Sequence, residues 1–165
     1  FISGSSKRSD RRILPAAELY YSGSSSERSS ETLDQWSNNS IRGGVEVKGR
    51  RNITIPEYGR YAINYKVQYY LKAANLTERL DDRDQVTATL VRYDGIQKHK
   101  SEKLRKTIKT RSVTHFHTKE VERDFIYESA NVILYTNDWL VLEVSLNAII
   151  PSDPESTYFS LRKLH

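Results

Sequence analysis

The chain has 165 residues and a mass of 19.1 kDa, which is the size of one ordinary domain rather than two. It contains no cysteine, and this excludes disulfide frameworks, thiolate zinc sites and cysteine nucleophiles. The 26 lysine and arginine residues exceed the 21 aspartate and glutamate residues, so the net charge of +5 suits an acidic partner without requiring one.

Residues 1–15 are predicted to form a flexible basic segment, and residues 16–165 a single folded domain. The first stretch is rich in Ser, Arg and Lys and has few apolar residues. It contains Arg8-Ser9-Asp10-Arg11, the R-x-x-R spacing that proprotein convertases cleave in secreted precursors, and Arg12 extends the basic cluster. A solvated basic tail explains the same residues, so the sequence leaves a processing site at Arg8 to Arg12 open.

Beyond Ser30, apolar residues recur at every second position, the spacing that turns successive side chains to opposite faces of a sheet. The same alternation appears at 45–47, 53–55, 60–69, 86–90 and 140–146. Turn-forming residues separate these runs: Gly43-Gly44, Pro56 with Gly59, Asp94-Gly95, Asn137-Asp138, and Pro151 with Pro154. This pattern predicts an all-β antiparallel sandwich or barrel. Only 71–80 and 102–108 have helix-like spacing, and both also fit loop or strand.

The chain has no glycine-rich phosphate loop, nucleophile elbow or spaced carboxylate motif, so we expect neither an enzyme nor a bound cofactor. His115 and His117 are two residues apart, which on a strand directs both imidazoles to one face and offers two zinc ligands. A third ligand is not apparent nearby, and an ordinary polar strand end explains the same pair.

The densest basic segment consists of Lys98, Lys100, Lys103, Arg105, Lys106, Lys109 and Arg111. Such a run binds sulfated glycans or phosphate backbones by charge, but it also suits a solvated edge strand, where lysine discourages edge-to-edge aggregation. The aromatic residues that single-stranded nucleic acid sites interleave with basic ones are missing. We therefore expect no nucleic acid partner and keep sulfated glycans as one of two interpretations.

Three glycosylation sequons begin at Asn38, Asn52 and Asn75, each near a predicted turn or strand end. With Ser and Thr this common, one or two would arise by chance. They favour secretion, and whether they are occupied is open.

Four parts of the chain resemble the tumour necrosis factor (TNF) ligand family and follow one another in that family's order. Residues 41–70 read IRGGVEVKGRRNITIPEYGRYAINYKVQYY, similar to a short strand, a strand ending in Pro and a Gly-x-Tyr strand. Residues 125–144 read FIYESANVILYTNDWLVLEV, similar to the penultimate hairpin, and residues 155–164 read ESTYFSLRKL, similar to the closing strand. Trp36 stands where many members place a tryptophan.

The resemblance implies a jelly roll of about ten strands that forms a homotrimer and binds cysteine-rich receptors of the TNF-receptor type in the grooves between subunits. It also implies an extracellular, cytokine-like ligand that is shed from the membrane or presented on it as the ectodomain of a type II membrane protein. Two other readings stay open: a complement-type globular head and a carbohydrate-binding β-sandwich module.

The resemblance further implies a trimer interface, in which Tyr127 and Tyr158 pack around the threefold axis and Ser129 and Ala130 permit close approach. The axis-facing residues of the Gly-x-Tyr strand would be Ala62, Asn64 and Lys66, a set more polar than the family usually shows. Arg162 replaces a residue that is usually aromatic or aliphatic. Because an unpaired charge buried there would cost several kcal/mol, we expect Glu128 to pair with it across the interface.

Receptor contact in this family comes from loops, and residues 93–103 form the strongest candidate. Tyr93 and Ile96 are aromatic or apolar residues among charges, as expected of an interface anchor, and Gln97 follows them. An alternative is that Tyr93 ends a strand and Ile96 packs beneath its own loop. Further candidate loops are 24–33, 71–85 and 148–155.

Overall fold

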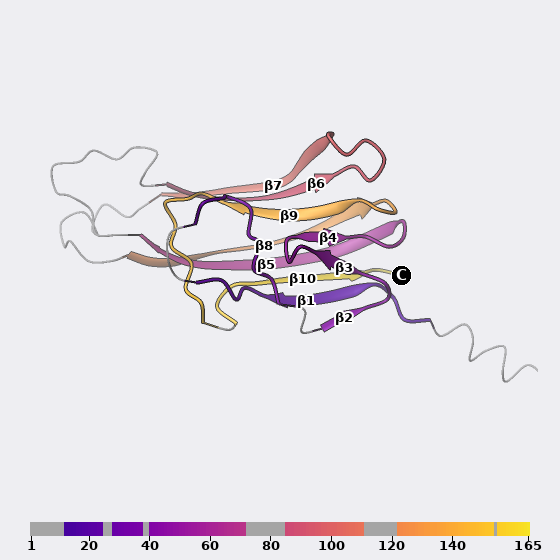
Figure 1. The fold of residues 1–165 in the computed structure, drawn as a ribbon, viewed down its shortest axis with the longest axis horizontal. Helices are drawn as coiled ribbons and strands as arrows, with labels where there is room; N and C mark the ends of the chain where they lie inside the picture. Colours follow the sequence, from indigo (N-terminus) through magenta and orange to yellow (C-terminus); the bar gives the residue numbers. More distant parts are fainter. Residues whose placement is uncertain (1–11, 25–27, 38–39, 72–84, 111–121, 154) are drawn as a thin grey trace, which may run out of the picture.

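The computed structural model describes residues 12–24, 28–37, 40–71, 85–110, 122–153 and 155–165, and within these ranges it contains strands and no helix. In chain order the strands are β1 (Ala16–Tyr20), β2 (Ser40–Arg42), β3 (Glu46–Lys48), β4 (Asn52–Thr54), β5 (Gly59–Leu71), β6 (Gln85–Tyr93), β7 (Ser101–Thr110), β8 (Glu122–Leu134), β9 (Trp139–Val144) and β10 (Tyr158–Lys163). The strands run along the long axis of the molecule (Figure 1).

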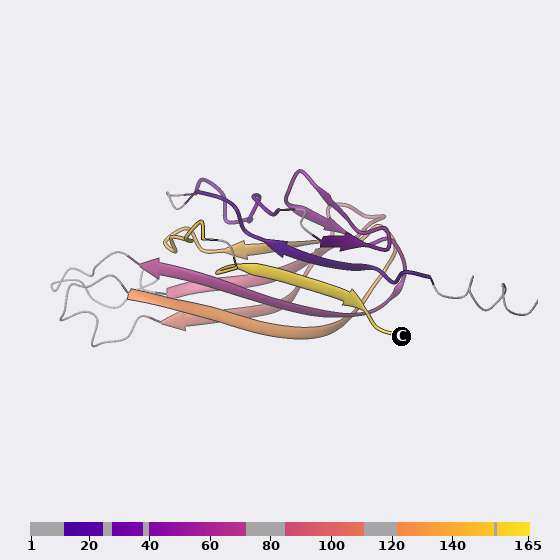
Figure 2. The ribbon, with the colours of Figure 1, turned by 90° about the horizontal axis from the view of Figure 1, so that it is seen from below.

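The strands form two sheets of five strands each. The β5 sheet has the order β2-β1-β10-β5-β8, and the β6 sheet has the order β3-β4-β9-β6-β7. Every pairing within them is antiparallel. Figure 2 shows β1, β10, β5 and β8 side by side in one layer. The predicted all-β class and the antiparallel β-sandwich are therefore confirmed.

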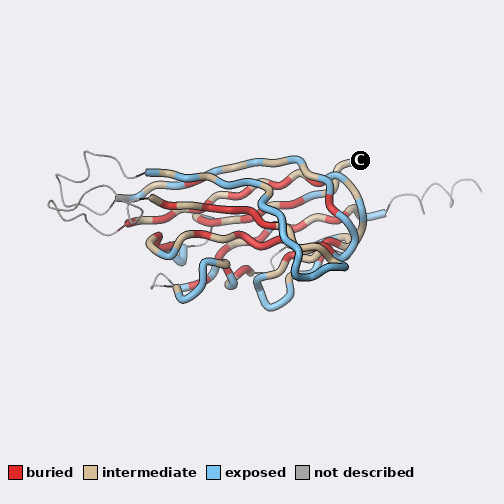
Figure 3. The backbone as a smooth tube through the Cα atoms, turned by 90° about the horizontal axis from the view of Figure 1, so that it is seen from above, coloured by how far each residue is buried: buried red, intermediate tan, exposed pale blue. Residues whose placement is uncertain are grey.

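Strand β5 shows why the two sheets pack face to face. From Tyr61 to Leu71 its side chains alternate between buried and half-buried, as the sequence pattern predicted. The buried set joins residues of the other sheet, such as Leu90 and Leu142, in one hydrophobic core. This alternation of buried and exposed positions is visible along the strands in Figure 3.

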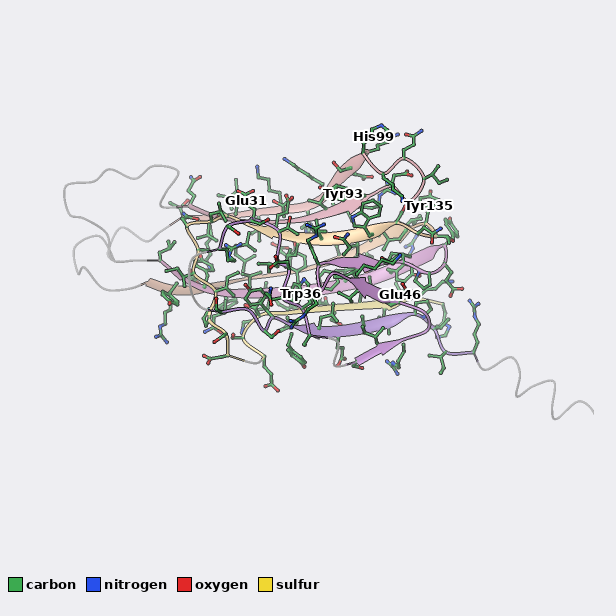
Figure 4. All side chains as sticks on the ribbon, viewed as in Figure 1. Glu31, Trp36, Glu46, Tyr93, His99 and Tyr135 are labelled. Atoms are coloured by element: carbon green, nitrogen blue, oxygen red, sulfur yellow. The ribbon has the colours of Figure 1, made fainter. Side chains whose placement is uncertain are left out.

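A chain of aromatic rings crosses this core. Trp36 is fully buried and lies 6.1 Å from the ring of Tyr21 and 6.1 Å from the ring of Phe159. Phe159 in turn stacks on Tyr65 at 6.3 Å between ring centroids. Trp36 thereby ties the segment between β1 and β2 to β10 and β5, and Figure 4 labels it within the body of the molecule.

Strand β7 resolves one of the two ambiguous segments, because residues 102–108 lie within it. Its pairing with β6 shifts register between Leu90 and Val91, whose partners are Arg105 and Lys103, so Leu104 is an extra, bulged residue. Leu104 packs against the core whereas Ile108, four residues further on, is 54% exposed, so their helix-like spacing does not form one buried face. In the other segment, Leu71 ends β5 and the residues that follow it, 72–84, lie outside the described ranges.

The described part of the N-terminal segment, residues 12–15, lies against the sandwich. The Arg12 guanidinium pairs with the Glu57 carboxylate at 3.1 Å, and the backbone N–H of Lys163 donates to the carbonyl of Pro15 at 2.8 Å. Residues 1–11, with most of the R-x-x-R cluster, lie outside the described ranges.

Two buried tyrosines of β5 give a matched test of this core. The hydroxyl of Tyr61 donates to the carbonyl of Glu57 at 2.8 Å, whereas the buried hydroxyl of Tyr65 has no hydrogen-bond partner among the described residues. We expect Tyr61→Phe to lower the free energy of unfolding by about 1 kcal/mol, because it leaves a carbonyl unpaired. Tyr65→Phe should leave that free energy unchanged or raise it.

Urea unfolding of the two variants beside the wild type measures both effects. A larger loss for Tyr65→Phe than for Tyr61→Phe would contradict the described packing of these side chains.

Candidate interaction surfaces

The outer face of the β5 sheet carries transverse rows of side chains that the strand register defines. One row contains Tyr20, Tyr158, Lys66 and Tyr127, which are successive partners across β1, β10, β5 and β8. The next row contains Glu18, Ser160, Asn64 and Ser129. We call the surface formed by these two rows the tyrosine face. It points away from the core, because the β5 residues on either side of Asn64 and Lys66 are buried.

Aromatic and apolar side chains of β8 are exposed on this outer side of the β5 sheet, both within the tyrosine face and beside it. Phe125, Tyr127 and Ile133 have 48%, 52% and 47% of their surface accessible. The Lys66 ammonium lies 5.0 Å from the centre of the Phe125 ring. Burial and the neighbouring phenols of Tyr127 and Tyr20 raise the pKa of Tyr158, since ionised phenols repel one another. The three tyrosines border an open hollow of about 520 Å³.

Most of the residues predicted for a trimer interface meet on this outer side of the β5 sheet. Tyr127, Ser129, Tyr158 and Asn64 lie in the two rows, and Arg162 pairs with Ala62 one step along the sheet. Arg162 is exposed.

Glu128 and Ala130 point to the other side of β8, because their β5 partners are the buried residues Tyr65 and Ile63. The Glu128 carboxylate accepts a hydrogen bond from the Thr107 hydroxyl at 2.6 Å and pairs with Arg105 at 3.2 Å. These contacts join the edge strands β7 and β8. A pairing of Glu128 with Arg162 of another subunit stays a prediction, and Arg105 would compete with it.

The second surface is the β6–β7 loop, residues 94–100, which is held in one conformation by its own hydrogen bonds. The Asp94 carboxylate accepts the N–H groups of Ile96 at 2.8 Å and Gln97 at 2.9 Å, which lowers the pKa of that carboxyl. The N–H of Lys100 donates to the carbonyl of Gln97. The loop so formed presents Ile96 with 91% of its surface accessible, and Gln97 is exposed too.

Tyr93 is only partly exposed, unlike Ile96 and Gln97, because its ring stacks on Trp139 at 5.2 Å between centroids. The ring is therefore part of a two-ring stack on the outer face of the β6 sheet. Figure 4 shows Tyr93 set back from His99, which lies at the outer end of the loop.

A buried carboxylate fastens this loop to the neighbouring β8–β9 turn. Asp138 is 2% exposed and accepts hydrogen bonds from the N–H groups of Gly95 at 3.0 Å and Tyr135 at 2.9 Å. It also pairs with Arg92 at 2.9 Å. The approach is so close that a β-carbon on Gly95 would lie 2.5 Å from the backbone of Asn137. The sequence predicts both turns, but no local pattern indicates that Asp138 of the β8–β9 turn binds the β6–β7 loop.

The other loops named as receptor candidates are described in part. In the 24–33 loop, where residues 25–27 are outside the description, Arg28 donates to the carbonyls of Val144 at 3.0 Å and Ser145 at 2.7 Å. Burial lowers the pKa of this guanidinium. In 71–85 only the two end residues are described, and in 148–155 all except 154.

The basic run divides between two environments on the edge strand β7 and the loop before it. Arg105 and Lys109 bind β8, with Lys109 pairing with Asp124 at 2.8 Å. The lysines at 98, 100, 103 and 106 are exposed. The described part of the run thus lies on the edge strand β7 and in the loop before it, and Arg111 lies outside the described residues. Sulfated glycan binding stays a prediction.

Several predicted sites fall wholly or partly outside the described residues. Asn38, Asn75, His115 and His117 all lie outside them, whereas Asn52 is the partly exposed first residue of β4. Within the described ranges, no group of three or more histidine and acidic residues is arranged to hold a metal ion. The same ranges contain no helix with the length and apolar character of a membrane span.

Comparison of the chain with protein-family models and with the sequences of curated proteins found no match. Any assignment of function therefore depends on the two surfaces and on the resemblance described above.

The role of Asp138 is tested by its replacement with alanine. We expect Asp138→Ala to lower the free energy of unfolding by about 3 kcal/mol or more, because Arg92 loses its buried partner and two N–H groups lose their acceptor. Asp153→Ala is the control, since Asp153 is exposed and should change stability by less than about 0.5 kcal/mol. Equal effects of the two variants in urea unfolding would contradict the described network.

Proposed function

We propose that the chain is an extracellular, cytokine-like ligand of the TNF type, which forms homotrimers and binds a cysteine-rich receptor of the TNF-receptor type. The observation that carries the proposal is the position of the resembling segments in the fold. Residues 41–70 span β2 to β5, residues 125–144 lie in the β8–β9 hairpin, and residues 155–164 contain β10. Each segment thus falls on the type of element that the resemblance assigned to it.

The strand order supports a jelly roll as the finer description of the sandwich. The last strand, β10, lies between β1 and β5, and β9 lies between β4 and β6. Chain neighbours such as β4 and β5 are therefore in different sheets, as the Greek-key connections of a jelly roll require.

The tyrosine face supports the trimer. Its exposed aromatic residues have the composition of an interface core, where aromatic side chains are enriched, and the adjacent Ser129, Asn64 and Ser160 are small or polar. Small side chains in the centre of the face allow neighbouring subunits to approach closely, and the tyrosines beside them supply contact area.

The loop presenting Ile96 supports receptor binding. Its backbone is held by Asp94 and Asp138, so little conformational entropy remains to be lost when a partner binds. An apolar side chain exposed at the tip of such a loop suits a pocket on a receptor.

The glycosylation sequons agree with an extracellular location, as a shed or membrane-presented ectodomain.

The absence of native cysteine allows a direct test of the association face. We expect Ser129→Cys protein, treated with a short tris-maleimide cross-linker, to give covalent dimers and trimers, because Ser129 would lie near the threefold axis. Ser101→Cys is the matched control, since Ser101 is also exposed but lies on β7 in the other sheet. Denaturing gel electrophoresis measures the products. Efficient cross-linking at Ser101 and none at Ser129 would show that the chain associates through a different surface.

The loop is tested by Ile96→Asp in binding assays against a panel of TNF-receptor-type ectodomains. We expect binding to weaken about tenfold or more, because an anchor side chain is lost and a charge enters its pocket. Ile108→Asp introduces the same change at an apolar side chain on β7 that is 54% exposed, and it should bind like the wild type. If only the Ile108 variant lost binding, this loop would not be the receptor contact.

A further inference from the structure

A second hollow, separate from the tyrosine face, lies on the outer side of the β6 sheet. It has a volume of about 460 Å³, within the roughly 300 to 1,000 Å³ of ordinary small-ligand sites. Lys48, Asn52 and Thr54, from β3 and β4, line one side of it. On the other side, the β6–β7 loop supplies Gly95 and Lys98, the β8–β9 turn supplies Asn137, and β9 supplies its first residue, Trp139.

The lining of this hollow is cationic. Lys48 and Lys98 come from elements far apart in the chain, and the described lining residues include no carboxylate. The nearest paired acid, Glu46, is 3.9 Å from Lys48, and both side chains are about two-thirds exposed, at 68% and 66%. Such a surface ion pair contributes little, so Lys48 keeps most of its capacity to attract an anion.

The same hollow also has groups that bind sugar hydroxyls and rings. Trp139 is partly exposed and braced by its stack on Tyr93, which gives a rigid aromatic surface. The amides of Asn52 and Asn137 and the hydroxyl of Thr54 offer donors and acceptors. The wall formed by the loop and the turn is fixed, because both are bonded to Asp138.

We propose that this hollow binds a sulfated saccharide, with Lys48 and Lys98 contacting sulfate groups and Trp139 contacting a sugar ring. Aromatic, amide and cationic groups together match a ligand that carries rings, hydroxyls and negative charge. The exposed Lys100, in the same loop as Lys98, adds a third positive charge, on the loop that lines the hollow. This arrangement favours a segment of a long polyanion over a single small anion.

The proposal requires neither the trimer nor a receptor, because the hollow is built entirely within one chain and lies on the sheet opposite the tyrosine face; it shares only the β6–β7 loop with the proposed receptor contact. Asn52, on its rim, begins a glycosylation sequon, so an N-linked glycan there would occupy the same space. The test therefore uses the full chain produced without N-glycosylation.

The probe is a fully sulfated heparin hexasaccharide, with its desulfated form as the chemical control. The chain has two tryptophans, and Trp36 is fully buried, so a change in fluorescence on binding reports on Trp139. Calorimetry gives the affinity. The charge variants are Lys48→Gln and Lys98→Gln in the hollow, with Lys106→Gln as the matched control on β7.

We expect saturable binding of the sulfated probe, a change in fluorescence, and weakening of about fivefold or more for each hollow variant. Each hollow variant should also reduce the slope of log affinity against log salt concentration by about one, because one counterion fewer is released. Lys106→Gln should weaken binding less than about twofold.

Equal losses for all three variants would overturn the proposal in favour of diffuse attraction to β7. Absence of saturable binding, or equal binding of the desulfated probe, would also overturn it. The molar mass of the variants, measured alongside, separates this result from any failure to assemble.

Discussion

Strand β5 organises both the core of the sandwich and the tyrosine face outside it. It alternates buried and half-buried residues from Tyr61 to Leu71, and it is paired along its length with β8 on one side and from Tyr61 to Lys66 with β10 on the other. Its inward side chains are committed to the core, where Tyr65 stacks on Phe159. Its outward side chains lie in transverse rows with those of β8 and β10, so the alternation that builds the core also forms the tyrosine face.

A second level of organisation comes from polar groups at the end of the sandwich where the β6–β7 loop meets the β8–β9 turn. The Asp138 carboxylate is inaccessible to solvent and satisfied by Arg92 and by two N–H groups, so the loop and the turn are fixed to one another. Two surfaces depend on that junction. The exposed Ile96 belongs to the loop, and the cationic hollow beside Trp139 has the loop and the turn as one wall.

The fold class could be predicted because alternation and turn chemistry are local signals that survive in the structure. Segments where tertiary contacts decide the outcome could not be predicted. Residues 102–108 fit a helix, a loop or a strand by their sequence, and they form a strand because they pair with β6. Five of the seven residues expected at the trimer interface share one side of a sheet, which period-two spacing makes predictable. Glu128 is bound to Arg105 of β7, a contact across sheets that no local pattern encodes. The hollow was missed because Lys48 and Lys98 lie on different elements that only the fold brings together.

We propose that the tyrosine face is covered by assembly of the chain into a trimer. Light scattering coupled to size-exclusion chromatography of the wild-type chain, over a dilution series, tests this assembly. We expect a mass near three times 19.1 kDa that persists on dilution. A mass that stays at that of a single chain at every concentration would contradict it, because the grooves between subunits on which the receptor model depends would then not exist.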